Sequence, residues 1–372
     1  MGFVLLIGAG LMTRTLMRLL AVDPGFDAEH VLTLDISLPA SRYSGAARVS
    51  SYFEEVLARI EALPGVHSAG AINYLPLSGS FYFLLPIRMA SEPVSLERAA
   101  AFRTVTANYF HALLIPLRRG RFFTESDGPG RPNVTIINEA MARTFWPARD
   151  PVGARFRAHK ELEVVGVVGD VRHDELKRAP RPEFYLPLRQ ETTPWMSLVV
   201  RTSGDPTAMA AAIRSQIRSV DPDQPISRLQ TMDRVVANSI SSQRSHMLLL
   251  GVFAGLALVL AVIGVYGVVA YSVTQRTHEF GVRLALGAQT GEVLRLVLGR
   301  GMTPVVIGVA AGLAGALALV PVLAAFVFGI QAHDPATFAA VTALILAVAL
   351  AACCIPARRA ARVDPLVALR YE

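Results

Sequence analysis

The sequence predicts a polytopic α-helical membrane protein with a large two-lobed α+β domain between its first and second transmembrane helices. Charged residues recur every few positions up to about Arg244, whereas residues 247–275 carry none and residues 301–332 carry no group that ionises at neutral pH. A hydrocarbon core about 30 Å thick needs about 20 apolar residues in a helix, so both stretches are long enough to span it. Residues 335–355 form a third apolar stretch, before an arginine-rich tail.

The apolar stretch at the start of the chain is the weakest candidate for a membrane helix. Its uncharged part ends at Thr13, and Arg14 and Arg18 follow, so this part alone is too short to span a bilayer. We expect residues 1–22 to form a transmembrane helix whose beginning is missing from the sequence. The alternative is a poorly spanning helix whose two arginines extend to the lipid headgroups.

The same stretch contains Gly8-Ala9-Gly10 after an apolar run, which resembles the start of a dinucleotide-binding turn. Such a turn needs a third glycine for close helix packing, and Thr13 occupies that position. A small-residue face on a membrane helix is therefore preferred. A membrane-bound oxidoreductase is the alternative that this partial motif would support.

Residues 23–245 are expected to form the α+β domain. Strand–helix–strand patterns lie at both of its ends, at residues 31–38, 46–63 and 66–73, and again at residues 196–202, 207–220 and 226–229. Between them the pattern predicts strands at 99–107, 134–137, 162–169 and 184–188 and one short helix at 139–145. We infer one lobe built from both ends of the domain and a second, strand-rich lobe inserted between them.

Residues 246–356 are expected to form a domain of three transmembrane helices. A helix at 231–240 is predicted to continue without a break into the first of these, at 247–273. The second is predicted at 301–328 with a kink at Pro321, and the third at 335–355, ended by Pro356. A tail follows at 357–372.

The arginines predict the orientation of this domain. Four of them lie between the first and second apolar spans, namely Arg276, Arg283, Arg295 and Arg300, and more follow the third span, whereas residues 329–334 contain none. Short cytoplasmic loops are enriched in arginine, so the connection at 275–300 and the tail should be cytoplasmic and the α+β domain external. The net charge of +7 is therefore attributed to contacts with lipid and to the orientation of the chain in the membrane. The sequence has no zinc-finger or basic-aromatic motif that would predict nucleic-acid binding.

The sequence shows no motif by which the chain itself could supply energy for transport. A phosphate-binding P-loop has lysine after glycine, and neither Lys160 nor Lys177, the only lysines, follows a glycine. The three apolar spans contain no acidic residue, which a proton- or sodium-driven carrier normally buries. If the chain is a transporter, a separate ATPase must act on its cytoplasmic side. We expect no catalytic, cofactor or metal site in the chain itself.

The polar interruption at residues 277–288 is the candidate binding segment for such a partner. Glu279, near its start, suits the dipole of a short helix, and apolar residues lie on two faces of that helix. One face would be buried by the membrane or the protein, and the other by a partner. An elbow lying among the headgroups explains the pattern equally well. Thr290 is expected to cap the next helix.

Asp170, His173 and Asp174 are a candidate metal-binding set, because carboxylates and imidazole suit several divalent ions. No further residue at ligand spacing supports this hypothesis. A solvent-exposed turn is the preferred interpretation.

The interruption and the tail carry a family resemblance. The segments are Glu279-x-Gly281-Val282-Arg283-x-Ala285-Leu286-Gly287-Ala288 and Pro356-Ala357-Arg358-Arg359-Ala360-Ala361-Arg362-Val363-Asp364-Pro365-Leu366-Val367-Ala368-Leu369-Arg370. Both closely resemble the permease subunits of the MacB/FtsX type of ABC transporter. Upstream, six short segments resemble parts of a MacB-like periplasmic core domain. They are Asp23-Pro24-Gly25-Phe26, Leu63-Pro64-Gly65-Val66, Asn138-Glu139-Ala140, Phe145-Trp146-Pro147, Gly166-Val167-Val168-Gly169-Asp170-Val171 and Asp221-Pro222-Asp223. The chain is most similar to one half of the tandem-duplicated permeases of acidobacteria.

The resemblance implies a fold, a location and a set of functional residues. It implies four transmembrane helices in the bacterial inner membrane, a periplasmic domain between the first two, and an ATPase bound to the loop after the second. The residues implied in that loop are Glu279, Phe280, Gly281, Arg283, Leu284, Ala285, Leu286, Gly287 and Ala288. Those implied in the tail are Pro356, Arg358, Arg359, Asp364, Pro365, Leu369 and Arg370.

The resemblance also implies how such a chain works. ATP hydrolysis by a separate cytoplasmic ABC ATPase would move the periplasmic domain and expel substrates, with a second permease half or a second copy as partner. The alternative is an FtsX-like signal transmitter that controls a periplasmic enzyme without transporting a substrate. A periplasmic adaptor or hydrolase is a further candidate partner.

Overall fold

The structure is a computed structural model that describes residues 2–79, 83–89, 98–276, 279, 282–283, 286, 289–319 and 334–360. The chain divides into two compact units. Val22–Ile240 form an α/β domain, and Met1–Ala21 together with Ser241–Glu372 form a helical unit.

The α/β domain contains eleven strands in its described part. The strands are β1 (Val31–Ser37), β2 (Val66–Ile72), β3 (Leu84–Met89), β4 (Arg98–Val105), β5 (Leu117–Gly120), β6 (Val134–Asn138), β7 (Arg155–Arg157), β8 (Glu161–Val168), β9 (Glu183–Pro187), β10 (Trp195–Thr202) and β11 (Ile226–Thr231). The helices are α2 (Ala46–Glu61), α3 (Tyr109–Ala112), α4 (Glu139–Phe145), η1 (Pro206–Met209), α5 (Ala210–Val220) and α6 (Met232–Ser239).

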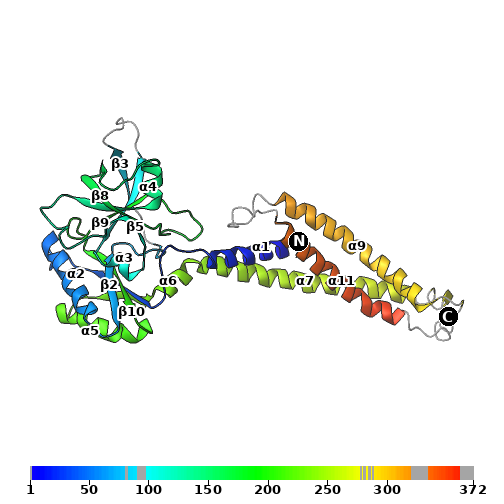
Figure 1. The fold of residues 1–372 in the computed structure, drawn as a ribbon. Helices are drawn as coiled ribbons and strands as arrows, with labels where there is room; N and C mark the ends of the chain where they lie inside the picture. The colour runs from blue at the N-terminus through cyan, green and yellow to red at the C-terminus, as the bar shows by residue number, and fades with distance from the viewer. Residues whose placement is uncertain are drawn as a thin grey trace. The chain divides into compact units, whose positions relative to one another are not determined.

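The first lobe is built from both ends of the domain, as the sequence predicts. Its strands lie in the order β11-β1-β10-β2, and each neighbouring pair is antiparallel. Each strand–helix–strand unit therefore has a strand of the other unit between its own two strands, which is the interlocked ferredoxin-like arrangement. Helices α2 and α5 lie side by side on one face of this sheet (Figure 1), where Phe53 and Ile60 pack with Ile213 and Ile217.

The inserted lobe is a closed ring of strands. β4, β3, β7, β8, β6 and β9 each pair with the next, and β9 pairs in parallel with β4 to complete the ring. Its own core, separate from that of the first lobe, contains Met141, Phe156 and Phe184. β3, β5, β7 and α3 were not predicted. β5 and β7 have four and three residues, two of them arginines in each case, so they are too short to show the periodicity that predicts a strand.

The pairing of β2 with β4 joins the strands of the two lobes into one sheet. It has one register pair, Ile72 with Val105, flanked by hydrogen bonds from the Asn73 N–H to the Thr104 carbonyl and from the Thr106 N–H to the Ala71 carbonyl, both at 3.0 Å. Helix α3 packs on β2, on the face of the sheet away from α2. There a Cβ on Gly70 would lie 2.5 Å from the Tyr109 Cα, so this close approach requires glycine. The two separate cores define two lobes within one domain.

In its described residues the helical unit contains four helices that are long and apolar enough to cross a membrane. They are α1 (Gly2–Leu20), α7 (Ser241–Gln275), α9 (Thr290–Ala318) and α11 (Pro335–Ala360), drawn with these labels in Figure 1. The predicted uninterrupted helix from 231 into the first span is wrong, because α6 ends at Ser239 with Ile240 as its C-cap. α9 begins at Thr290, within one residue of the expected helix start, and continues into the apolar span predicted from 301. The kink expected at Pro321 lies outside the described residues.

Helix α1 is integrated into this unit by close contacts. A Cβ on Gly10 would lie 2.9 Å from the Thr337 side chain of α11, and one on Gly312 of α9 would lie 2.7 Å from the Phe3 Cβ. Arg14 forms an ion pair with Asp334, which also accepts a hydrogen bond from the Thr337 backbone at the start of α11. Gly8 and Gly10 therefore lie within a packed helix, and the strand and turn of the dinucleotide-binding hypothesis are not formed.

Candidate functional site

The segment after α7 is the candidate partner-binding site, and the structure describes part of it. Glu279, Arg283 and Leu286 are described, whereas Phe280, Gly281, Leu284, Ala285, Gly287 and Ala288 lie outside the described residues. The Glu279 carboxylate accepts a hydrogen bond from Arg283 Nη2 at 2.8 Å and lies 3.7 Å from Arg276 Nη1. One turn later, the Leu286 N–H donates to the Val282 carbonyl at 3.0 Å.

One apolar side chain of this segment, that of Leu286, is exposed to solvent. The pairing of residues four apart stabilises a single helical turn by a few tenths of a kcal/mol, so it orients the turn more than it stabilises the protein. Leu286 is 82% exposed. It follows Arg283 by three residues in the chain, and its backbone N–H is hydrogen-bonded to the Val282 carbonyl.

The start of α9 differs from the prediction. Thr290 is the first residue of the helix, and Gln289 is its N-cap without a side-chain hydrogen bond to the backbone. Thr290 therefore does not cap the helix. Glu292 does lie in the first turn, where the helix dipole favours a carboxylate.

The tail residues Pro356, Arg358 and Arg359 lie within α11, and Asp364, Pro365, Leu369 and Arg370 lie outside the described residues. The expectation that Pro356 ends the helix is wrong. Proline removes one helical hydrogen bond, but Cys353 and Ala357 on either side of it are fully buried in a cluster with Val269 and Val297. That packing holds the last turns of α11 in helical form.

Three of the quoted sequence motifs of the α/β domain meet at Asp170. Its Oδ1 accepts a hydrogen bond from the Ala140 N–H at the start of α4, at 2.7 Å, and its Oδ2 accepts one from Arg143 in the last turn of that helix, at 2.6 Å. Gly25 packs directly on the other side. A Cβ on Gly25 would lie 1.9 Å from the Asp170 carbonyl oxygen, and its φ of +84° also favours glycine.

The turn at residues 23–25 is also hydrogen-bonded to the neighbouring Arg172. The Arg172 N–H donates to the Pro24 carbonyl at 2.9 Å, and its Nε donates to the Asp23 carbonyl at 3.3 Å. Asp23 in turn accepts from the Gly25 N–H at 2.8 Å. We call residues 23–25 the entry turn, because they follow α1 in the chain, and residues 170–173 the receiving loop.

The side chain of His173 in the receiving loop is only 6% exposed, so the interpretation of this segment as a solvent-exposed turn is wrong for that side chain. Its Nε2 lies 3.0 Å from Glu183 Oε2. Glu183 Oε1 accepts a hydrogen bond from Arg103 Nε at 2.6 Å, and its other oxygen accepts one from the Tyr185 hydroxyl at 3.0 Å. No set of three metal-ligand side chains in the described part of the chain is arranged to hold an ion.

The electrostatics of this cluster depend on burial. Burial alone would raise the pKa of Glu183, but the charges and hydrogen bonds of His173 and Arg103 outweigh it and lower that pKa to about 2. Burial lowers the pKa of His173, although Glu183 acts in the opposite direction. Arg103 is therefore the permanent counter-charge. The cluster fixes the receiving loop to β4 and β9 of the inserted lobe.

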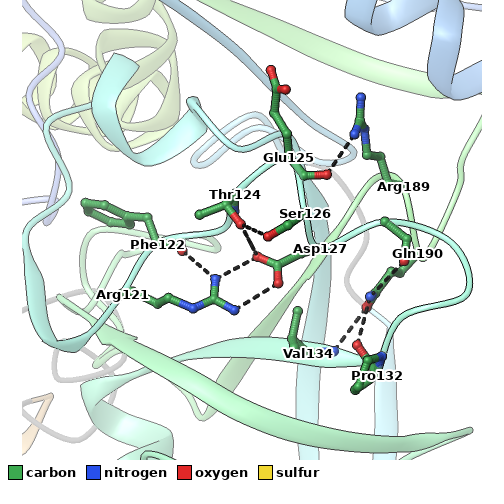
Figure 2. Close-up of polar contacts among 11 residues, drawn as sticks. Arg121, Phe122, Thr124, Glu125, Ser126, Asp127, Pro132, Val134, Arg189 and Gln190 are labelled. Carbon is green, nitrogen blue, oxygen red and sulfur yellow. Dashed lines mark hydrogen bonds and ion pairs between the residues drawn. The ribbon is translucent and has the colours of Figure 1, made fainter.

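A second group of polar contacts bridges the two lobes. Figure 2 shows Arg189 donating to the Glu125 carbonyl, and Arg189 also donates to both carboxylate oxygens of Glu54 on α2, at 2.6 and 2.8 Å. The loop that carries Glu125 is closed by two hydrogen bonds from Arg121 to Asp127 (Figure 2). A cleft of about 280 Å³ lies here, between α2 and this loop.

These polar groups are not evident from the sequence. Arg103 and Glu183 are 80 residues apart, and Arg189 and Glu54 are 135 residues apart. No local spacing marks such pairs. Burial of a charged residue is the only signal, and it appears once the fold is known.

Comparison with known proteins matches both parts of the chain. Residues 15–220, more than half of the chain, match the family model of the MacB-like periplasmic core domain. Residues 251–365 match the model of the FtsX-like permease C-terminal domain. The periplasmic region of MacB from Actinobacillus actinomycetemcomitans is a similar solved structure, at 16% identity and a TM-score of 0.40, covering 57% of this chain and 94% of that one.

Similar full-length proteins include two exporters and a permease. The chain is 28% identical over 268 residues to the pyoverdine export ATP-binding/permease protein PvdT of Pseudomonas syringae, covering 69% of this chain and 40% of that protein. It is 28% identical over 387 aligned positions to the macrolide export ATP-binding/permease protein MacB of Rhodospirillum rubrum, covering 96% and 58%. It is 24% identical over 287 residues to the uncharacterised ABC transporter permease YknZ of Bacillus subtilis, covering 74% and 71%.

The chain thus spans about half of the two exporters, whose names include an ATP-binding function. The two family models match in the order expected from the fold, the α/β domain first and the helical unit after it. The four apolar helices fit a membrane protein. The chain belongs to the family of MacB/FtsX-type ABC transporter permeases.

Proposed function

We propose that the chain is the permease subunit of an ABC exporter in which a separate ATPase binds residues 277–288 and moves the α/β domain. In this proposal the chain lies in the bacterial inner membrane, with the α/β domain in the periplasm and residues 277–288 in the cytoplasm. The arginines of the 275–300 connection support this orientation, because positive charge accumulates in short cytoplasmic loops.

The observation that carries the proposal is the exposed Leu286, which follows the Glu279–Arg283 ion pair in the chain. In the proposal the ATPase hydrolyses ATP and its movement is passed to the permease through a contact surface. An exposed apolar side chain near charged groups could provide part of such a surface. The relatives named as ATP-binding/permease proteins support an ATP-driven partner.

Pairing with a second permease half or a second copy is part of the proposal. The face of α7 that carries Gly251 and Gly255 supports it, because a Cβ at either position meets no atom within 4 Å in the described chain. Small residues at this spacing allow close helix approach. The transported compound is proposed only as a periplasmic substrate.

The test uses the full chain purified with a candidate ABC ATPase. Leu286→Asp places a charge in the proposed contact and is expected to lower ATPase binding at least tenfold. Arg149→Asp, on the exposed surface of the α/β domain, is the control and should bind normally.

A second variant separates helix stability from partner contact. The double exchange Glu279→Arg with Arg283→Glu keeps an ion pair within the turn but exchanges the two charges. If the pair serves only the turn, binding should survive the exchange. We expect binding to be lost. Equal ATPase binding by the wild type and Leu286→Asp would refute the proposed site.

A further inference from the structure

A groove of about 530 Å³ lies on the inserted lobe between β5 and α4. Four arginines line it, and they are Arg118 and Arg119 of β5, Arg143 of α4 and Arg149 of the loop that follows α4. The lining also contains the carboxylates of Glu139 and Asp150. Four guanidinium groups and two carboxylates give the lining a formal charge of +2.

Three of these guanidinium groups have unused hydrogen-bond donors. Arg118 Nε lies 3.5 Å from Glu139 Oε2, and Arg119 Nη1 lies 3.7 Å from Asp150 Oδ1, with the two arginine side chains 53% and 60% exposed. Ion pairs of this length between exposed side chains are weak. In the described part of the chain, no side-chain hydrogen bond is donated by Arg118, Arg119 or Arg149. Their N–H groups are therefore available to a ligand.

The α4 side of the groove is held in place by packing and by an ion pair. The half-buried Trp146 ring lies 6.0 Å from the Phe145 ring and 6.1 Å from the Phe156 ring, measured between centroids. Arg143 donates a hydrogen bond to Asp170 at 2.6 Å, so this arginine is already engaged. The groove thus combines an aromatic wall with free guanidinium groups.

The chemistry of the free groups selects the ligand. A guanidinium group offers five N–H donors in a planar fork and no acceptor, which suits oxyanions. A carboxylate has two oxygens and one charge, whereas a phosphate monoester has three terminal acceptor oxygens and a charge of about −1.5 to −2 at neutral pH. Three unengaged arginines therefore suit a phosphate monoester better than a carboxylate. The volume lies within the range of about 300–1,000 Å³ that is usual for small-molecule sites.

We propose that this groove binds the phosphate monoester group of a small organic compound. The phosphate oxygens accept hydrogen bonds from Arg118, Arg119 and Arg149, and the organic part lies against Trp146. This site is additional to the proposed ATPase contact at residues 277–288 and does not depend on it. A lipid headgroup that ends in a phosphate monoester carries the same chemistry, so the experiment includes both sources.

The test uses the fluorescence of Trp146 in the full chain. The chain has two tryptophans, so Trp195→Phe leaves Trp146 as the only one. The protein is placed in nanodiscs of phosphatidylcholine, which contains no phosphate monoester, and titrated with phenyl phosphate. The emission should change saturably, and benzoate should bind at least tenfold more weakly because it carries a carboxylate on the same ring. Dialysis with isotopically labelled phenyl phosphate measures the same affinity without relying on Trp146.

Two substitutions test the arginines. Arg149→Gln removes one donor fork and should lower the affinity for phenyl phosphate at least fivefold, and Arg149→Lys should not restore it fully because a lysine has no planar fork. Arg131→Gln is the matched control, because Arg131 is also an exposed arginine but lies outside the lining of the groove. That variant should bind like the wild type.

The outcomes decide both the site and the source of its ligand. Nanodiscs that also contain phosphatidic acid should weaken phenyl phosphate binding if a lipid headgroup reaches the groove, and unchanged binding assigns the site to a soluble compound. Equal affinities for phenyl phosphate and benzoate would overturn the proposal. So would equal binding by Arg149→Gln and Arg131→Gln, or the absence of saturable binding in both the fluorescence and the dialysis measurements.

Discussion

Replacing Glu183 by glutamine should release the receiving loop from the inserted lobe. The side chain keeps its shape but loses its charge, so the buried Arg103 is left without its counter-charge and one amide N–H faces other donors. Removing one partner of a buried ion pair typically costs about 3–5 kcal/mol. The lowered pKa of Glu183 agrees in direction, because it means that the folded protein stabilises the ionised carboxylate.

Hydrogen exchange of the full chain measures this loss directly. A loss of about 3 kcal/mol corresponds to roughly 100-fold faster exchange through local opening. The acceleration should appear in the receiving loop, β4 and β9. The control is Glu191→Gln in the same lobe, where the carboxylate is partly exposed beside Lys160. It should cost less than about 1 kcal/mol. Similar exchange rates for Glu183→Gln and the wild type would refute the reasoning.

The same pair predicts a pH dependence with a definite sign. Because the folded pKa of Glu183 is lowered, its stabilisation is fully present above pH 4.5 and is lost as the pH falls towards 2. The difference between the wild type and Glu183→Gln should therefore shrink across this window. A difference that stays constant as the pH falls would show that the charge of Glu183 is not the source of the stabilisation.

Three further substitutions probe the fold around the site. Asp170→Ala removes the hydrogen bond from the Ala140 N–H and an exposed ion pair with Arg143, and should lower the stability of this region by about 1–2 kcal/mol. The loss should appear as faster hydrogen exchange of α4, and unchanged exchange would argue against this role of Asp170. Gly312→Leu should displace α1 from α9, because even a Cβ lies 2.7 Å from Phe3, and cysteine cross-linking of the two helices should fall. Arg189→Ala should speed exchange of the 123–127 loop by about tenfold, and an effect confined to α2 would contradict the bridge.

Elements with strong local periodicity were predictable from the sequence. The helix expected at 46–63 is observed as α2 (Ala46–Glu61), and the short helix expected at 139–145 is α4 with those bounds. Periodicity depends only on residues that are near one another in the sequence, so it can be recognised without knowing the fold. The interlocking of the two strand–helix–strand units was predicted only as a shared lobe, because strand order depends on long-range pairing.

The missed features depend on contacts between distant residues. β7 is a strand of three residues whose pairing with β3 and β8 closes the ring. Pro356 continues a helix because the packing around Cys353 and Ala357 outweighs one lost hydrogen bond. The contact between Gly25 and Asp170 joins two segments that lie more than 140 residues apart, so their sequence spacing does not reveal it. Tertiary packing decides each case.

The most direct test of the central claim is a photo-cross-linker at position 286 in the full chain, in membranes that contain the candidate ATPase. If residues 277–288 are the ATPase-binding site, illumination should join the permease to the ATPase. The same group at position 260 of α7, an exposed apolar position within the apolar span, should not form this product. Cross-linking of position 286 only to lipid, or equal ATPase cross-linking from both positions, would contradict the account.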